Sequence, residues 1–315
     1  MFPIQLLQEG QVLIAQGSKW YIEHTTPHHG CMYAIKNYIY SGDTSFQQVD
    51  IVDTFVYGRC LILDGNIQSA QFDEHIYHEA LVHPAVVFHP SPRRVLVMGG
   101  GEGAVLRELC KYPFIKEITM VDLDRQVVEL CQRYLPTWHR GSYHDPRVNV
   151  IYQDARQYIN DTDCQYDLIY SDLTEPDPEG PSYRLFTRQF YELVKRRLAP
   201  GGLLILQAGG IALDYLGVHA AIRNSLTPAF GHICSYRAYI PSFNTDWGFI
   251  VASCQEGRPE ISGEQIDEFL KDIATSLKYY DGQTHRGMFY LPKDVRSALQ
   301  LNKTVIEDER PLSSY

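Results

Sequence analysis

The glycine-rich segment Gly99–Gly103, with Glu102 inside it, is the feature that most restricts the fold. It directly follows the apolar run 95–98, which is typical of a short strand, and directly precedes a helical stretch that begins at Ala104. Glycines allow a sharp turn and let a ligand approach the backbone without interference from a Cβ atom. A strand, such a turn and a helix in this order indicate a βαβ unit. Taken alone, the turn is weak evidence for a nucleotide-like ligand.

The same alternation of strand and helix continues along the chain. Further strand-like runs lie at 118–121, 148–151, 168–170, 203–206, 233–239 and 247–253. Helical stretches are expected at 104–111, 125–134, 155–160, 183–198, 211–227, 263–277 and 293–301. This alternation predicts an α/β domain, in which helices cover both faces of a parallel sheet.

The first 70 or so residues have a different pattern. Segments 20–24, 32–40 and 49–57 are rich in β-branched and aromatic residues, and turn signals such as Gly58 and Gly65 separate strand-like segments here. A helical stretch follows from residue 74. We therefore expect a small antiparallel β domain over residues 1–72 and the α/β domain over 73–315.

Composition narrows the function. The 315 residues include 28 Lys and Arg against 38 Asp and Glu, a formal net charge of −10. Nucleic-acid binding needs a basic face that displaces counterions, so this balance argues against it and is compatible with a cationic ligand. Seven scattered cysteines without a C-x-x-C pair favour reduced thiols in the cytoplasm over a disulfide framework or a zinc site. No window of about 18 apolar residues predicts a membrane span.

Two carboxylates lie at strand ends that should meet the glycine-rich turn. Asp122 ends the next strand, at the position from which an acidic side chain accepts hydrogen bonds from ribose hydroxyls. Asp154 follows a third strand, where a carboxylate could meet an adenine amine. Together with the turn, these residues predict a ligand that contains adenosine.

Glu102 indicates which kind of adenosine ligand this is. A dinucleotide needs free amides at the helix N-terminus for its pyrophosphate, and a negative charge in the turn would repel phosphate. A sulfonium, as in relatives of S-adenosylmethionine, suits that charge better. The alternative is that Glu102 points to solvent or caps the helix.

A second acidic segment follows the strand at 168–171. Asp172 lies at the strand tip, where ligands bind in open α/β sheets, and we interpret it as functional. Glu175, Asp177 and Glu179 crowd the loop beyond it and would attract a cation. For Asp177 and Glu179 we favour a solvated acidic loop without a direct role.

These motifs together resemble one family, the polyamine aminopropyltransferases, which comprise the spermidine, spermine and thermospermine synthases. The similarity covers nearly the whole chain and is carried in order by Phe46-Gln47, Leu63–Gln68, Asp73–Glu79, Gly99–Gly103 and Tyr170–Pro176. It implies a small N-terminal β domain followed by a Rossmann-like domain of the S-adenosylmethionine-methyltransferase type. It also implies a homodimer or homotetramer.

The resemblance implies transfer of the aminopropyl group of decarboxylated S-adenosylmethionine to an amine, with no metal and no permanently bound cofactor. The donor would be held by Gln47, Gly99, Gly101, Glu102, Asp122, Asp154, Ala155 and Pro181. The amine acceptor would be held by His78, Glu102, Asp172, Glu175, Gln207, Phe243 and Trp247. Asp172 would be the general base, assisted by Tyr77. A free alkylamine is protonated at pH 7, so a nearby carboxylate has to accept its proton before it can attack.

The acceptor is the most open question. Phe243 stands where spermidine synthases commonly carry a tyrosine, and the surrounding motifs are closer to thermospermine synthases. We expect spermidine to be a better acceptor than putrescine, with thermospermine favoured over spermine as product. The alternatives are a spermidine synthase that uses putrescine or agmatine, a methyltransferase, and a polyamine-sensing protein without turnover. A methyltransferase would need a pocket for the methionine carboxylate where this chain has Glu102.

Overall fold

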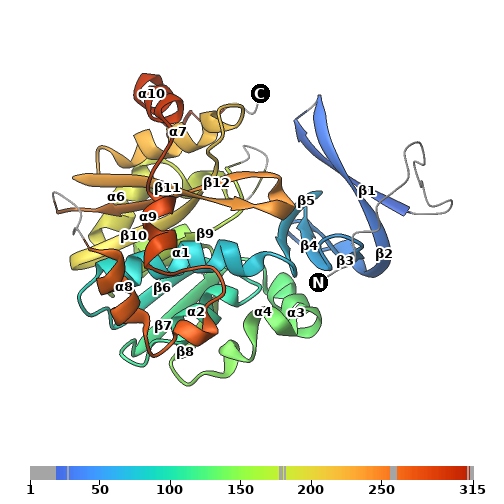
Figure 1. The fold of residues 1–315 in the computed structure, drawn as a ribbon, viewed down its shortest axis with the longest axis horizontal. Helices are drawn as coiled ribbons and strands as arrows, with labels where there is room; N and C mark the ends of the chain where they lie inside the picture. Colours follow the sequence, from blue (N-terminus) through green and yellow to red (C-terminus); the bar gives the residue numbers. More distant parts are fainter. Residues whose placement is uncertain are drawn as a thin grey trace.

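The N-terminal part of the chain forms an antiparallel sheet that is separate from the sheet of the larger part (Figure 1). The computed structural model describes residues 19–26, 28–176, 180, 182–255, 261–310 and 312. The sheet has the order β1-β2-β3-β4-β5, with strands β1 Lys19–Thr26, β2 His29–Asp43, β3 Gln48–Thr54, β4 Arg59–Leu63 and β5 Asn66–Ala70. Its long first hairpin lies beside the larger part, and His29 Nδ1, near the hairpin tip, is 3.3 Å from the Tyr215 hydroxyl.

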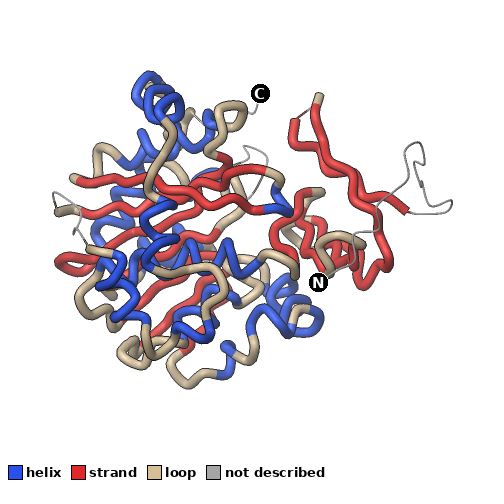
Figure 2. The backbone as a smooth tube through the Cα atoms, viewed as in Figure 1, coloured by secondary structure: helices blue, strands red, loops and turns tan. Residues whose placement is uncertain are grey.

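A second sheet of seven strands, in the order β11-β12-β10-β9-β6-β7-β8, forms the centre of the larger part (Figure 2). Its strands are β6 Arg94–Gly99, β7 Glu117–Asp122, β8 Val148–Tyr152, β9 Tyr166–Asp172, β10 Leu198–Gly210, β11 His232–Ile240 and β12 Thr245–Ser253. The Rossmann-like fold class is therefore confirmed, and β6 to β10 are parallel to their neighbours within that group. β12 is antiparallel to both of its neighbours, β10 and β11, because the short turn Pro241–Phe243 joins it to β11 as a hairpin.

Helices cover both faces of this sheet, as predicted. The core on one face includes residues of α1 Glu74–Phe88, α2 Ala104–Cys110, α8 Gly263–Leu270 and α9 Gly282–Met288. The core on the other face includes residues of α5 Ala155–Asp161, α6 Arg188–Arg196 and α7 Leu216–Leu226. The remaining α-helices are α3 Arg125–Tyr134, α4 Pro136–His139 and α10 Lys293–Leu301. Within the described ranges, no helix combines the length and the apolar character needed to cross a membrane.

The N-terminal sheet is attached to the larger part through α3 and α4. Val49 and Ile51 of β3 belong to the same apolar cluster as Val127 and Trp138, and all four are almost fully buried. The indole Nε1 of Trp138 donates to Ser69 Oγ at 2.7 Å. This packing fixes the N-terminal sheet over the carboxyl ends of the parallel strands.

Three predicted helices are shorter than the sequence pattern indicated, and the one expected at 211–227 begins only at Leu216. The helix expected at 263–277 ends at Leu270, and a 3₁₀ turn follows at Ala274–Ser276. The helix expected at 183–198 begins only at Arg188, because the Thr187 side chain accepts from the Phe190 N–H and caps it there.

Candidate active site

A cavity of about 1060 Å³ lies where the two sheets meet, at the carboxyl ends of β6, β7 and β9. This is the edge at which open α/β sheets bind ligands. Fourteen of the predicted site residues line it: Gln47, Tyr77, His78, Gly99, Gly101, Glu102, Asp122, Asp154, Ala155, Asp172, Glu175, Gln207, Phe243 and Trp247. Pro181, also predicted, lies outside the described residues, as do Asp177 and Glu179.

The glycine-rich turn is packed directly against the end of β9. Gly99 and Gly100 have φ angles of 79° and 72°, in the left-handed region that favours glycine. A Cβ atom on Gly99 would lie 2.2 Å from the carbonyl oxygen of Asp172. The Gly100 N–H donates to that same oxygen at 3.0 Å. The turn and the Asp172 backbone therefore form one rigid unit.

Tyr77 and Asp172 form a short hydrogen bond in the cavity. The Tyr77 hydroxyl donates to Asp172 Oδ1 at 2.6 Å. Enclosure by the protein, together with the charge of Glu102, raises the pKa of Asp172 to about 7. Enclosure and the charge of Asp172 raise the pKa of Tyr77 well above its usual value, so the phenol remains a donor. Asp172 can thus exchange a proton near neutral pH.

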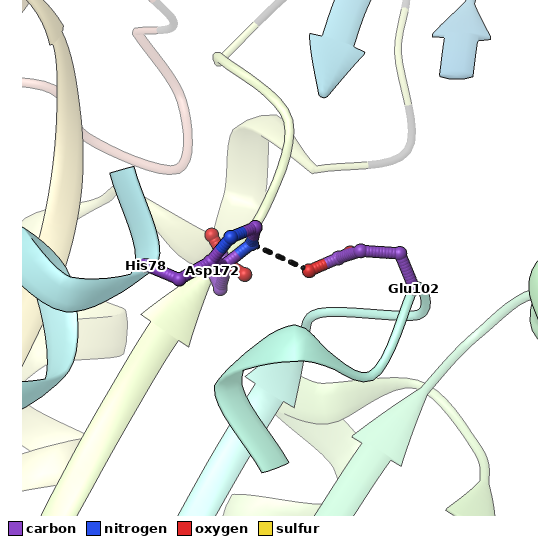
Figure 3. A group of neighbouring side chains, drawn as sticks. All are labelled: His78, Glu102 and Asp172. Carbon is purple, nitrogen blue, oxygen red and sulfur yellow. Dashed lines mark hydrogen bonds and ion pairs between the residues drawn. The ribbon is translucent and has the colours of Figure 1, made fainter. Parts of the chain in front are cut away.

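His78 and Glu102 form a buried ion pair beside Asp172. Figure 3 shows these three side chains pointing toward one another from α1, from the glycine-rich turn and from the end of β9. His78 Nε2 lies 2.8 Å from Glu102 Oε1. Burial alone would lower the pKa of His78, but hydrogen bonds to Glu102 and Glu74 outweigh it and raise that pKa to about 10. Burial opposes ionisation of Glu102, yet the bond to His78 lowers its pKa.

The arrangement of these three side chains differs from that of a metal site. Their potential ligand atoms all lie within 4.8 Å of one another. His78 Nδ1, however, lies 2.6 Å from the Glu74 carbonyl oxygen, and Nε2 faces Glu102. A histidine that donates from both nitrogens has no lone pair for a metal. We therefore interpret the group as a charge cluster.

The predicted donor residues occupy the side of the cavity near β7 and β8. Burial raises the pKa of Asp122 to about 7. A hydrogen bond from the Asp124 N–H acts in the opposite direction but is the smaller effect. Asp154 caps α5 by accepting from the Gln157 N–H at 2.8 Å. The Gln47 side chain reaches over from the N-terminal sheet and donates to Asp124 Oδ2 at 3.2 Å.

The predicted acceptor residues lie on the opposite side. The rings of Phe243 and Trp247 pack edge to face, with centroids 4.7 Å apart, and the buried Trp247 Nε1 has no hydrogen-bond partner among the described residues. Glu175 is exposed to solvent at the cavity wall, and the protein around it raises the pKa of its carboxyl. Gln207 is almost fully buried; its amide donates to Leu173 O at 2.6 Å and accepts from the Gly209 N–H. Gln207 therefore supports the loop at the cavity wall.

Sequence reasoning missed several residues of this site. Glu74 precedes His78 by four residues on α1, and this spacing, which brings side chains together on a helix, is the signal that could have identified it. Arg107 of α2 binds the Glu74 carboxylate with two hydrogen bonds, of 3.1 and 2.8 Å. Glu23 and His24 of β1 also line the cavity, and only the folded position of the N-terminal sheet places them there.

Comparison with known proteins agrees with this architecture. Residues 74–263 match the spermine/spermidine synthase domain, and residues 19–71 match the spermidine synthase tetramerisation domain. The chain is 39% identical over 279 residues to polyamine aminopropyltransferase 2 of Hyperthermus butylicus, across 88% of this chain and 91% of that protein. It is 38% identical over 302 residues to polyamine aminopropyltransferase 2 of Pseudomonas aeruginosa, across 95% and 86% of the two chains.

Two solved structures are similar as well. A spermidine synthase in complex with the transition state analogue AdoDATO has a TM-score of 0.83 and 28% identity, and the match covers 90% of this chain and 96% of that one. The spermidine synthase of Thermotoga maritima has a TM-score of 0.80 and 26% identity, over 90% and 95% of the two chains. The chain therefore belongs to the spermine/spermidine synthase family and is an enzyme of the polyamine aminopropyltransferase type.

Proposed function

We propose that this enzyme transfers the aminopropyl group of decarboxylated S-adenosylmethionine, the co-substrate of its family, to a polyamine amine. The amine nitrogen attacks the carbon next to the sulfonium, the carbon–sulfur bond breaks, and its electron pair leaves on sulfur as neutral 5′-methylthioadenosine. The nitrogen gives up one proton. The observation that carries this proposal is the Tyr77–Asp172 pair beside the ionised Glu102.

Asp172 is the proposed acceptor of that proton. Its pKa of about 7 leaves a substantial part of the carboxyl ionised at neutral pH, while keeping it basic enough to take a proton from an ammonium. The Tyr77 hydroxyl holds Oδ1, which leaves Oδ2 for the amine. The leaving group is neutral, so the site needs no donor to stabilise an oxyanion.

Glu102 is the proposed selector of the donor. Its carboxylate faces the cavity and would attract the terminal ammonium of the decarboxylated donor, whereas the carboxylate of S-adenosylmethionine would meet a like charge. Glu102→Gln should weaken binding of the decarboxylated donor. It should therefore reduce the ratio by which the enzyme prefers that donor to S-adenosylmethionine. Calorimetry on the parent protein that gave equal affinities for both donors would remove this role.

For the acceptor, we propose spermidine in preference to putrescine, with thermospermine as the product. Phe243 and Trp247 offer an apolar wall to the methylenes of a long amine, and Glu175 and Glu23 place acidic groups along the same cavity. The Phe243 ring lacks the hydroxyl that would anchor the distal nitrogen of a short diamine. Values of kcat/KM for putrescine, agmatine and spermidine at fixed donor test this, and a clear preference for putrescine would overturn it.

We also propose a homodimer or homotetramer built through the N-terminal sheet, supported by the match of residues 19–71 to a tetramerisation domain.

The cytoplasm is the proposed compartment, because the buried thiols of Cys60 and Cys131 suit a reducing environment.

Mass spectrometry of the products tests the proposed reaction. The purified enzyme is supplied with decarboxylated S-adenosylmethionine or S-adenosylmethionine, each with a panel of amines. Release of 5′-methylthioadenosine together with an aminopropylated amine is the expected result. Formation of S-adenosylhomocysteine would identify a methyltransferase instead, and binding without any product would indicate a sensor.

A further inference from the structure

A buried row of charges runs from α2 to the cavity and alternates in sign. Glu108 accepts from Arg107 Nε at 2.8 Å, and Arg107 binds both carboxylate oxygens of Glu74. Glu74 Oε2 lies 3.0 Å from His78 Nδ1, and His78 Nε2 lies 2.8 Å from Glu102. All five residues are less than 9% exposed. Of these, only His78 and Glu102 line the cavity.

The proton between His78 and Glu102 has two possible positions. Nδ1 must carry a hydrogen, because the Glu74 carbonyl oxygen at 2.6 Å can only accept. The proton on the other side can lie on Nε2, which makes an ion pair, or on Glu102, which makes a neutral pair. When the shared proton lies on His78 Nε2, Glu102 is an anion that faces the cavity. When the proton lies on Glu102, this pair places no negative charge at the cavity.

We propose that Glu74 is a positioning residue: its carboxylate keeps His78 as an imidazolium and thereby keeps Glu102 ionised toward the ligand. This inference rests on the proposed function in one respect: the ligand group that faces Glu102 is taken to be the terminal ammonium of the donor. The charged groups that face His78 are Glu74 from its own helix, Glu102 from the glycine-rich turn and Asp172 from β9, while Arg107 of α2 acts through Glu74.

Glu74 and its partner Arg107 have opposite charges, so their removal has opposite effects on the protonation of His78. Glu74→Gln removes a stabilising anion and leaves Arg107 positive nearby, which drives the shared proton from Nε2 to Glu102. Arg107→Gln leaves Glu74 negative and favours the imidazolium still more. Both variants disrupt a buried ion pair and should lower stability. A purely structural role would therefore make them behave alike.

The test compares binding of the decarboxylated donor and of 5′-methylthioadenosine, which lacks the ammonium, by calorimetry at about pH 6.5, near the usual histidine pKa. Glu74→Gln should weaken donor binding by about 10- to 100-fold, the range expected for one charge-assisted contact, with little effect on methylthioadenosine. Arg107→Gln should retain the donor preference. Glu108→Gln is the matched control: it removes another buried carboxylate partner of Arg107 that does not touch His78.

The pH dependence of donor binding also distinguishes the proposal from a purely structural role of Glu74. In Glu74→Gln, raising the pH removes the shared proton and leaves Glu102 ionised beside a neutral His78, so donor affinity should recover. Solid-state NMR of protein labelled with ¹⁵N-histidine gives the protonation of His78 without any ligand. An imidazolium signal for His78 in Glu74→Gln at pH 6.5, or an equal loss of donor affinity in both variants, would overturn the proposal.

If Glu74→Gln fails to fold, the double variant Glu74→Gln/Arg107→Gln is used in its place. This variant removes both charges of the Glu74–Arg107 ion pair, so neither is left without its partner. It should bind the donor less tightly than the parent, and unchanged affinity would count against the proposal. If the parent protein binds neither ligand, the proposed function fails, while the NMR measurement still decides the protonation of His78.

Discussion

The proposed role of Asp172 as the base makes the reaction depend on a single proton. Because its pKa is raised to about 7, the carboxyl is protonated at lower pH and cannot accept a proton from the amine. We therefore expect kcat/KM for the acceptor to fall as the pH drops through about 7. The Tyr77 hydroxyl donates to Asp172 and lowers its pKa, so Tyr77→Phe should move the midpoint of this decline to higher pH. A pH–rate profile measured for both proteins checks the direction, and a shift to lower pH would contradict it.

Replacing the base itself tests its role more directly. Asp172→Asn keeps the shape of the side chain but cannot take the amine proton, so kcat should fall by about 10²- to 10⁴-fold, the usual contribution of general base catalysis. The affinity for donor, measured by calorimetry, should change little. Turnover close to that of the parent would exclude Asp172 as the base.

The location of a single residue in the fold could be predicted where that residue ends a parallel strand. Asp122 and Asp172 end parallel strands, and parallel strands bring their carboxyl ends to one edge, so both could be assigned to a ligand site. The partners of His78 could not be deduced in this way. Arg107 acts on it through Glu74 and comes from another helix, and the sequence contains no periodic signal for such a contact.

At the scale of elements, the 3₁₀ turn Pro241–Phe243 depends on α1. The Asp73 carboxylate, just before α1, accepts from the Ser242 N–H at 2.6 Å and from Ser242 Oγ at 3.0 Å. The Tyr57 hydroxyl donates to the Pro241 carbonyl oxygen at 2.9 Å. These bonds hold Phe243 against Tyr77, with ring centroids 6.0 Å apart. The acceptor side of the cavity is therefore aligned with the proposed base by a buried carboxylate outside the cavity.

Asp73→Asn should loosen this turn. An amide cannot accept both hydrogen bonds as a carboxylate does, so we expect a loss of about 1.5–3 kcal/mol in the free energy of unfolding, measured with urea. KM for the acceptor should rise, while KM for the donor stays unchanged. Ser242→Ala is the control: it keeps the backbone N–H bond and should have the smaller effect. An equal rise in both KM values would show that the turn does not act on the acceptor side alone.

Element types were more predictable than element ends or directions. The strands and helices between 95 and 227 follow from alternating apolar runs, whereas the reversed direction of β12 depends on its short connection to β11. The end of α8 at Leu270 follows from a 3₁₀ turn that the apolar spacing of 263–277 does not reveal. Tertiary contacts and caps decide such boundaries, and hydrophobic periodicity does not encode them.

At the scale of the whole molecule, the first hairpin has one apolar face that nothing in the described chain covers. Ile22 of β1 and its cross-strand neighbour Met32 of β2 are 52% and 58% exposed, and Trp20 lies on the same face. The alternate residue Glu23 points the other way and lines the cavity. Assembly through the outer face would cover the apolar residues and leave the cavity open.

We therefore expect Ile22→Lys to lower the assembled mass, because a charge on this face opposes burial. Light scattering combined with gel filtration measures the mass, with Gln300→Lys on the exposed part of α10 as a control of equal charge. Activity per chain should persist in the smaller form if the cavity is complete within one chain. An unchanged mass for Ile22→Lys would place the interface elsewhere.

The close contact between Gly99 and the Asp172 carbonyl has a consequence for how such an enzyme can diverge. Any side chain at Gly99 would displace the end of β9, and with it Asp172, the proposed base, so the glycine-rich turn and this residue cannot vary independently. Phe243 and Trp247 of the last hairpin approach the cavity without that backbone linkage. Natural or laboratory evolution therefore has more freedom to acquire a new amine there than to exchange the donor at the glycine-rich turn.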